Sequence, residues 1–229
     1  YTSPGMVVKA RLSDFTCVGT LTLNTGEDKL VSAVIDAANG YAYFGTETSP
    51  GFIVKVRLSD FTRVGAMALY PGEDNLRLSV VDSTHGFAYF GTHTSIVVKV
   101  RLSDFIRVGA LALQSTDRSL RSAVIDITNG YAYFGRSGIF SSTEVGEWLA
   151  PGQIDAVRLS DFKWAGTLGL DWGENEPVSA VIDTANGFAY FGTISESWYS
   201  PIHSGIYLGR IVKVALYGGT FDFSLSNSG

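Results

Sequence analysis

One pattern of about 45 residues recurs along nearly the whole chain and constrains its fold more than any other feature. The segment 55–61, Lys-Val-Arg-Leu-Ser-Asp-Phe, returns unchanged at 99–105, with close variants at 9–15 and 156–162. A second marker is a short apolar run that ends in aspartate. The four marker aspartates are Asp36, Asp82, Asp126 and Asp183, spaced by 46, 44 and 57 residues. Near-identical copies must stack so that each buries its apolar face on the next.

Each copy predicts four short β-strands. Examples of the first and second strands are 79–82 and 87–92, and examples of the third and fourth, from the preceding copy, are 53–58 and 63–69. Asn39-Gly40 separates the first two strands of one copy, and Asn-Gly favours a tight hairpin because both residues accept positive φ. The turn Ser59-Asp-Phe61 separates the last two strands. No long segment has a helical period, so the pattern indicates an all-β fold.

The short apolar strand ending in Asp, the Gly turn and the aromatic strand that follows (Tyr41-Ala-Tyr-Phe-Gly45) together resemble NHL and YVTN-type repeats. This resemblance implies a β-propeller of four-stranded antiparallel blades. We expect an outer half-blade at 1–28 and full blades at about 29–73, 74–117, 118–173 and 174–229. The array then forms the C-terminal part of a propeller of about seven blades. The repeat wording also resembles repeats of large secreted microbial or algal proteins.

Composition excludes several partners. The formal net charge is −5 and the basic residues form no cluster, which argues against nucleic acid. No run approaches the roughly 18 apolar residues that a membrane-spanning helix needs, so we expect no membrane insertion. Cys17 is the only cysteine, which excludes a disulfide within the chain. Ser/Thr/Gly-rich, Lys-poor composition, together with the resemblance, leads us to expect an extracellular or cell-surface location.

The recurring polar residues have two interpretations each. The marker aspartates could bind a hard cation, or each could accept hydrogen bonds from its own hairpin turn, which we favour. Lys55 and Arg57, with their counterparts in other copies, could form a belt for an acidic ligand. We favour pairing with the acidic segments 26–28 and 72–74. We expect no catalytic residue, metal site or cofactor, because no nucleophile, phosphate-binding or metal-ligand spacing occurs.

Two insertions break the repeat between its second and third strands, each adding 13 residues, at about 136–153 and 194–210. Long loops rich in Trp and Tyr are typical of contact surfaces, although they could also cover exposed apolar surface. We expect the insertions to lie side by side on adjacent blades. The candidate binding residues are Phe140, Trp148, Trp198, Tyr199, His203 and Tyr207.

Near-identical blades offer the same surface repeatedly, whereas an active site needs different residues in different blades. The sequence therefore favours a non-enzymatic surface, matrix or filament component that self-associates or binds extracellular proteins or glycans. The first alternative is a carbohydrate-binding, lectin-like propeller. A propeller lyase or hydrolase is the third hypothesis, and it would depend on Glu144, Glu147 and His203 or on blades outside this sequence.

Overall fold

The computed structural model describes residues 4–113, 118–141, 148–194 and 209–216, which form strands, turns and loops. The chain divides into two compact units, Tyr1–Ala110 and Leu111–Gly229, and each is described by itself. No helix long and apolar enough to cross a membrane occurs in these ranges.

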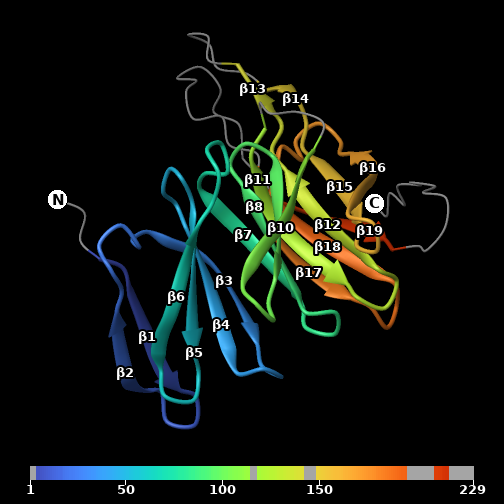
Figure 1. Cartoon of the computed structure of the whole chain (residues 1–229). Coiled ribbons are helices and arrows are strands. Elements are labelled where there is room, and N and C mark those ends of the chain that lie inside the picture. Colours follow the sequence, from blue (N-terminus) through green and yellow to red (C-terminus); the bar gives the residue numbers. More distant parts are fainter. Residues whose placement is uncertain (1–3, 114–117, 142–147, 195–208, 217–229) are drawn as a thin grey trace. The chain divides into compact units, whose positions relative to one another are not determined.

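The first unit contains three antiparallel sheets (Figure 1). The first has two strands, β1 (Met6–Arg11) and β2 (Thr16–Thr22). The second has the order β3 (Leu30–Asp36), β4 (Tyr41–Thr46), β5 (Phe52–Arg57) and β6 (Thr62–Ala68). The third has the same order in β7 (Leu76–Asp82), β8 (Phe87–Thr92), β9 (Ile96–Arg101) and β10 (Ile106–Ala112), whose last residues enter the second unit.

The second unit repeats this arrangement with one addition. One sheet is formed by β11 (Leu120–Asp126), β12 (Tyr131–Arg136), β15 (Gln153–Arg158) and β16 (Lys163–Gly169). Between β12 and β15 the chain forms a small hairpin, β13 (Ile139–Phe140) and β14 (Trp148–Ala150). The last sheet has three described strands, β17 (Glu176–Asp183), β18 (Phe188–Ile194) and β19 (Arg210–Ala215).

The predicted all-β fold of four-stranded antiparallel sheets is confirmed. One detail was wrong, because the first strand of each full sheet is not short: β7 begins at Leu76 and contains seven residues, where only 79–82 was expected. Its first residues, Leu76-Arg-Leu78, include a charged side chain and so carry less apolar character than its end. The expected fourth strand at 220–225 lies outside the described residues.

Within each unit, the core lies between consecutive sheets, because each sheet presents an apolar face to its neighbour. In the first unit, Val7 and Leu23 pack with Val54 and Val56. The aromatic strand provides the largest buried side chains, among them Tyr43, Tyr89, Tyr133, Phe90, Phe134 and Phe191. Burial therefore holds neighbouring sheets together face to face.

A phenylalanine closes the turn between the third and fourth strands of each copy in a conformation that disfavours it. Phe15, Phe61, Phe105 and Phe162 have φ values of 53–55°. This left-handed backbone costs a non-glycine residue about 1–2 kcal/mol. The next residues resume the strand after a bulge, as in three-residue hairpin loops. At position 61 the aromatic ring offsets this cost, because it packs against Gly19 of the preceding sheet and lies under Lys9 of the same sheet.

This arrangement predicts opposite effects of one substitution at two equivalent positions. Phe61→Gly relieves the backbone strain but removes the contact with the preceding sheet, so we expect a net loss of about 1–2 kcal/mol of stability. Phe15 is 90% exposed, so Phe15→Gly should be neutral or stabilising by about 0.5 kcal/mol. Urea unfolding midpoints measure both variants. A larger loss for Phe15→Gly than for Phe61→Gly would contradict this account.

Candidate functional site

Each marker aspartate holds its own hairpin turn. Asp36 accepts hydrogen bonds from the backbone N–H of Asn39 (3.4 Å) and from its side-chain Nδ2 (2.8 Å). Asp126 is fully buried and accepts the same pair from Asn129, at 3.1 and 2.7 Å. In the second full copy His85 takes the place of Asn, with Nδ1 2.8 Å from Asp82. The hypothesis of a turn role is confirmed, and no group of three potential metal ligands occurs among the described residues.

The recurring lysine of the third strand lies against aromatic rings of the adjacent second strand. Lys55 is buried, and its Nζ lies 4.0 Å from the ring centre of Tyr41 and 5.6 Å from those of Tyr43 and Phe105. Burial lowers the pKa of Lys55, while the charge of Asp36 opposes that shift. In this blade the structure thus brings the marker aspartate Asp36 and Lys55 together beside one cluster of aromatic rings. Lys99 and Lys213 repeat the arrangement over Phe87 and Phe188.

The predicted pairing of these cations with the Gly-Glu-Asp segments was wrong. Arg57 pairs instead with Asp60 of its own turn at 3.0 Å, and Arg11, Arg101 and Arg158 do the same with Asp14, Asp104 and Asp161. Lys55 lies within the aromatic cluster and not at the outer surface. Arg57 reaches Asp60 because the two residues are only three positions apart in the same turn. Lys55 lies against the rings because it is paired with Tyr43 on the neighbouring strand β4.

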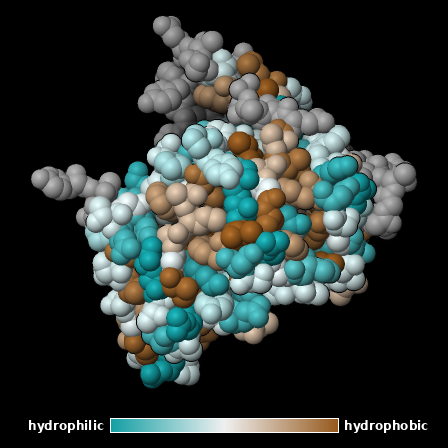
Figure 2. Space-filling model, viewed as in Figure 1, coloured by the Kyte–Doolittle hydropathy of each residue, from teal (hydrophilic) through white to brown (hydrophobic). Residues whose placement is uncertain are grey.

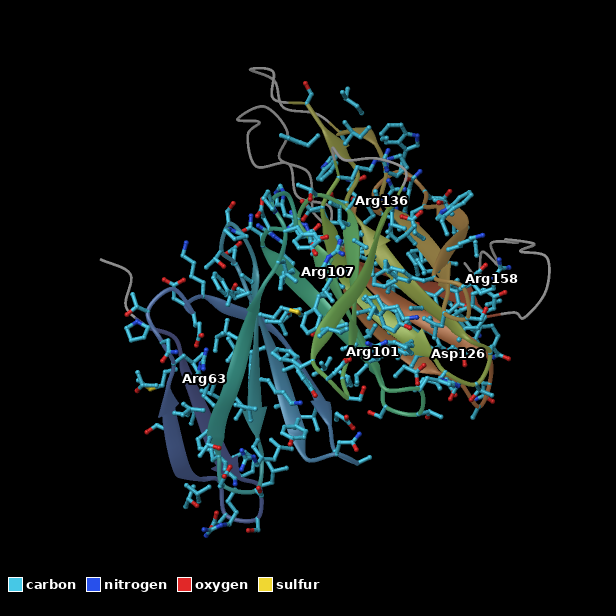
Figure 3. The ribbon with its side chains drawn as sticks, viewed as in Figure 1. Arg63, Arg101, Arg107, Asp126, Arg136 and Arg158 are labelled. Carbon is cyan, nitrogen blue, oxygen red and sulfur yellow. The ribbon has the colours of Figure 1, made fainter. Side chains whose placement is uncertain are left out.

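The glutamates of these segments bind a different arginine, on the fourth strand of the next sheet (Figure 3). Arg63 makes two hydrogen bonds to Glu27, one of them at 2.7 Å. Arg107 binds Glu73 through Nε at 2.9–3.0 Å and through Nη2. Burial acts to raise the pKa of Glu27, but the hydrogen bond and charge of Arg63 together with the backbone N–H of Asn24 outweigh burial and hold that pKa below its usual value. These pairs clamp consecutive sheets together in the first unit.

The sheet β11–β12–β15–β16 departs from the repeat in its interior. Arg136 stands where other copies have Thr46 and Thr92, and Asp155 stands where they have Val54 and Val98. Arg136 Nε lies 2.8 Å from Asp155 Oδ2, and both side chains are at most 2% exposed. A buried ion pair replaces a Thr and a Val, which is costly unless every charged atom is engaged.

Neighbouring departures give this pair further partners, although Arg136 Nη1 is buried without a hydrogen bond. Arg136 Nη2 donates to Gln153 Oε1 at 2.7 Å. Asp155 Oδ1 accepts from Trp164 Nε1 at 3.3 Å and from the hydroxyl of Thr167. Trp164 is 38% exposed, so the buried carboxylate orients a partly exposed indole ring. The sheet β11–β12–β15–β16 therefore carries its own polar network where the sheets of the first unit have a Thr and a Val.

The first insertion begins directly after Arg136, and its base is anchored from both sides. Gly138 N–H donates to Asn175 O at 2.7 Å, and Arg118 Nη1 donates to Pro151 O at 3.1 Å. A side chain at Gly138 would collide with Ala150 O, so only glycine fits there. These contacts fix the direction in which the β13–β14 hairpin leaves the sheet (Figure 1).

Two predicted binding residues meet on this hairpin. Phe140 and Trp148 are paired across the strands, with ring centres 5.2 Å apart and planes at 68°. Edge-to-face packing is a favourable aromatic geometry. Phe140 is 38% exposed and Leu149 is 56% exposed. Phe140, Trp148 and Leu149 thus form an apolar surface on the β13–β14 hairpin, which we call the platform.

The other predicted site residues, Trp198, Tyr199, His203 and Tyr207, lie outside the described residues, as do Glu144 and Glu147. Whether the two insertions lie side by side is therefore untested. Sequence reasoning missed Arg136, Asp155, Trp164 and Thr167 as one network. The signal was available as charged residues at positions where the other copies are apolar or neutral.

No protein-family model matches the sequence, and no curated protein matches it. Solved structures do match its fold. The WD40 repeats of RRP9 align with a TM-score of 0.58 at 6% identity, covering 84% of this chain and 50% of that one. The U3-55K structure aligns at 0.59 and 6% identity, covering 93% and 58%. The computationally designed Ika4 protein aligns at 0.56 and 6% identity, covering 82% and 91%.

The fold is therefore that of a β-propeller, whose four-stranded antiparallel sheets are its blades. The chain spans about half the length of the WD40 structures it matches. At 6% identity these likenesses define the architecture alone, because propellers carry many unrelated functions.

Proposed function

We propose that this chain is a non-enzymatic structural or assembly module, a repeat component of an extracellular surface, matrix or filament. The observation that carries the proposal is how the repeated polar residues are used. Asp36 and its counterparts hold turns, Lys55 and its counterparts lie on rings, and Arg63 and Arg107 clamp glutamates. These contacts build the repeat itself, which suits a scaffold made of interchangeable blades.

The β13–β14 platform supports a contact role for the third full blade. Phe140 and Leu149 expose apolar surface on a hairpin that is anchored at its base. A preorganised aromatic surface binds a partner with little loss of conformational entropy. We infer that this platform carries self-association or binding to other extracellular proteins. The extracellular location rests on the composition and on the resemblance to secreted repeats, and the NHL/YVTN-type affiliation belongs to the same proposal.

The second candidate function is carbohydrate binding. Phe140 and Trp164 are each 38% exposed, and both are side chains of the kind that stack on sugar rings. Both belong to the blade that departs from the repeat. A lectin role would use these rings as discrete sites and would leave the chain monomeric.

Light scattering across a concentration series, with electron microscopy of the same samples, tests the assembly function. We expect concentration-dependent assembly, and we expect Trp148→Ala with Phe140→Ala to weaken it at least about tenfold while the far-UV β spectrum is unchanged. Trp172→Ala is the matched control, because Trp172 is a 64% exposed tryptophan that lies between β16 and β17 and not on β13 or β14. Strict monomers that bind a glycan array through the platform would support the lectin function and contradict assembly.

A further inference from the structure

One sheet lacks the lysine that three others place against their aromatic strand. In those three sheets the lysine is paired with a tyrosine of the second strand, in the pairs Tyr43–Lys55, Tyr89–Lys99 and Tyr190–Lys213. In β15 the same position is Ala156, which is paired with Tyr133. Alanine ends at Cβ, so this sheet has no counterpart of the remaining methylene groups and the ammonium group of lysine.

The described residues around Ala156 have not grown to fill that space. The buried core next to Lys55 contains Tyr43, Ile53, Leu69, Ala88, Phe90, Val98, Val100 and Leu102. The core that contains Ala156 has the same residue type at each equivalent position, in Tyr133, Ile154, Leu170, Ala189, Phe191, Val212, Val214 and Leu216. At its rim Ile182 takes the place of Val81, and the added carbon replaces only part of a lysine side chain.

The aromatic rings keep the same spacing without the lysine. In the last sheet, Lys213 Nζ lies 3.6 Å from the centre of the Phe188 ring, and the ring centres of Phe188 and Tyr190 are 6.5 Å apart. Tyr131 and Tyr133 occupy the equivalent positions, and their ring centres are 6.4 Å apart. The two rings have therefore not closed on each other where the lysine is missing. In the other sheets an ammonium group lies on rings at these positions, which is a favourable cation–π arrangement.

The buried carboxylate of this sheet lacks the lysine found beside its counterparts. In three sheets the charges of the lysine and the marker aspartate interact, in the pairs Asp36–Lys55, Asp82–Lys99 and Asp183–Lys213. Asp126, labelled in Figure 3, is 0% exposed and accepts hydrogen bonds from Asn129, but its sheet has Ala156 in place of the lysine. Buried charges are normally paired in proteins, so Asp126 favours a cation at this place.

Tyr133 adds a hydroxyl group to the same place. Its Oη is buried and has no hydrogen-bond partner. Burial and then the charge of Asp126 raise the pKa of Tyr133 well above its usual value, so the hydroxyl group lies within the field of that carboxylate. Tyr43 Oη also has no partner beside Lys55, whose ammonium group is tethered to its own strand. A free ammonium group can approach such a hydroxyl oxygen and donate to it.

The place beside Ala156 is enclosed, which limits the size of a ligand. Ala156 is 1% exposed and Tyr133 is 2% exposed, so both lie beneath the mixed hydrophilic and hydrophobic surface that Figure 2 shows for one face. Tyr131 is half-buried, and Arg158, its partner across the strands, is exposed. The open side is therefore the end that carries Tyr131, where the lysine ammonium group lies in the other sheets. A polypeptide backbone does not fit into so enclosed a site.

We propose that the interior beside Ala156 binds a small primary amine, with its ammonium group against the Tyr131 ring and near Asp126, and its alkyl chain along Ala156. The part of lysine beyond Cβ corresponds to n-propylammonium, so the ligand class is a free amine of about three carbons. In the other sheets the chain itself supplies this ammonium group. The ligand site is additional to the proposed assembly function, because neither Phe140 nor Trp148 contributes to it.

Titration of the intact chain with n-propylammonium chloride, followed by ligand-observed saturation-transfer NMR, tests the proposal. We expect saturable binding with a dissociation constant of about 0.1–10 mM, because a ligand of so few atoms gains limited binding energy. 1-Propanol has a similar shape without the charge and should bind at least about tenfold more weakly. No saturable binding of n-propylammonium would overturn the proposal, as would equal binding of 1-propanol.

A further titration separates a free amine from a lysine of another protein. Nα-acetyl-lysine amide carries the same ammonium group on a backbone, and we expect it to bind at least about tenfold more weakly than n-propylammonium. Stronger binding of this compound would assign the site to a protein partner and contradict the proposal of a free amine.

Two variants locate the ligand. Ala156→Lys supplies the ammonium group that the repeat itself places here, so it should abolish n-propylammonium binding and raise the melting temperature by several degrees. Tyr131→Phe is the matched control, because Phe87 and Phe188 occupy the equivalent position in other sheets, and it should bind like the wild type. Unchanged binding to the Ala156→Lys chain would place the ligand elsewhere and refute the proposal.

Lys55→Ala creates the same place in the first unit, next to Tyr41 and Tyr43. The variant should bind one more n-propylammonium ion per chain than the wild type, and the amine should restore part of the melting temperature that the substitution lowers. The far-UV spectrum verifies that the variant is folded. Binding by Lys55→Ala together with none by the wild type would show that the place beside Ala156 is closed to amines, and the proposal would fail. Self-association through the platform is measured separately by light scattering, so its failure is distinguishable.

Discussion

Arg136→Thr is expected to destabilise the chain by about 3–5 kcal/mol, because it leaves the carboxylate of Asp155 buried without its partner. Asp155→Val should cost a similar amount by leaving the guanidinium buried. Both new residues are those that the repeat itself places at these positions, as in Thr46 with Val54 and Thr92 with Val98. Any loss therefore reports the missing charge and not a poor fit to the fold.

The double variant Arg136→Thr with Asp155→Val is expected to lie within about 1 kcal/mol of the wild type, since replacing both members of a buried pair is often neutral. Adding Thr167→Ala, which copies Ala66, removes the hydroxyl that would lose its acceptor. Chemical unfolding followed by tryptophan fluorescence measures the four chains of the cycle. A double variant as unstable as the sum of the single variants would contradict the prediction, as would single variants that cost under about 1 kcal/mol.

If the Arg136–Asp155 ion pair adds no stability over Thr and Val, we expect its effect to be on the position of the exposed aromatic side chains nearby. Asp155 accepts the indole N–H of Trp164. Arg136, labelled in Figure 3, directly precedes the anchored β13–β14 hairpin that carries Phe140 and Trp148. The stable double variant should therefore show an altered Trp164 environment and weaker self-association. This separates a role in orienting the surface from a role in stability.

Arg107→Ala is expected to cost about 2–3 kcal/mol, because the side chain of Glu73 is only 6% exposed and would lose its two-nitrogen partner. Glu73 also accepts the backbone N–H of Tyr70 at 3.1 Å, so it joins its own turn to the next blade. Tyr70 adds to the clamp, since the guanidinium of Arg107 lies 4.3 Å from the centre of its ring.

Arg101→Ala is the matched control in the same blade, because its pair with Asp104 is local and exposed on both sides. We expect no measurable change in its unfolding midpoint, as for most surface ion pairs. Equal effects of Arg101→Ala and Arg107→Ala would show that the clamp is no stronger than a surface pair. Arg63→Ala should resemble Arg107→Ala, since it faces Glu27 in the same way.

Most of the fold could be predicted from the sequence because each blade is a local unit. The alternation of Ile53-Val-Lys-Val-Arg, the Asn39-Gly40 turn and the aromatic run 41–44 each specify their own strand or turn through neighbours close in the chain. Repetition then gave the sheet order, because the same pattern must solve the same packing problem each time. The hydrogen-bonding role of Asp36 was predictable for the same reason.

The contacts between blades could not be predicted in this way. Glu27 lies 36 residues from Arg63 in the sequence, and the prediction paired its segment with Lys55 and Arg57, whereas Arg57 pairs with Asp60. The buried pair of Arg136 and Asp155 likewise depends on β12 and β15 lying side by side, across an insertion.

The sequence alone thus determined the repeating unit, its strands and its turns, because these depend on alternation and on turn chemistry within a few residues. Only the tertiary structure decided which charges meet and which rings cover Lys55. Those outcomes depend on distances between residues far apart in the chain, which packing sets and local sequence does not.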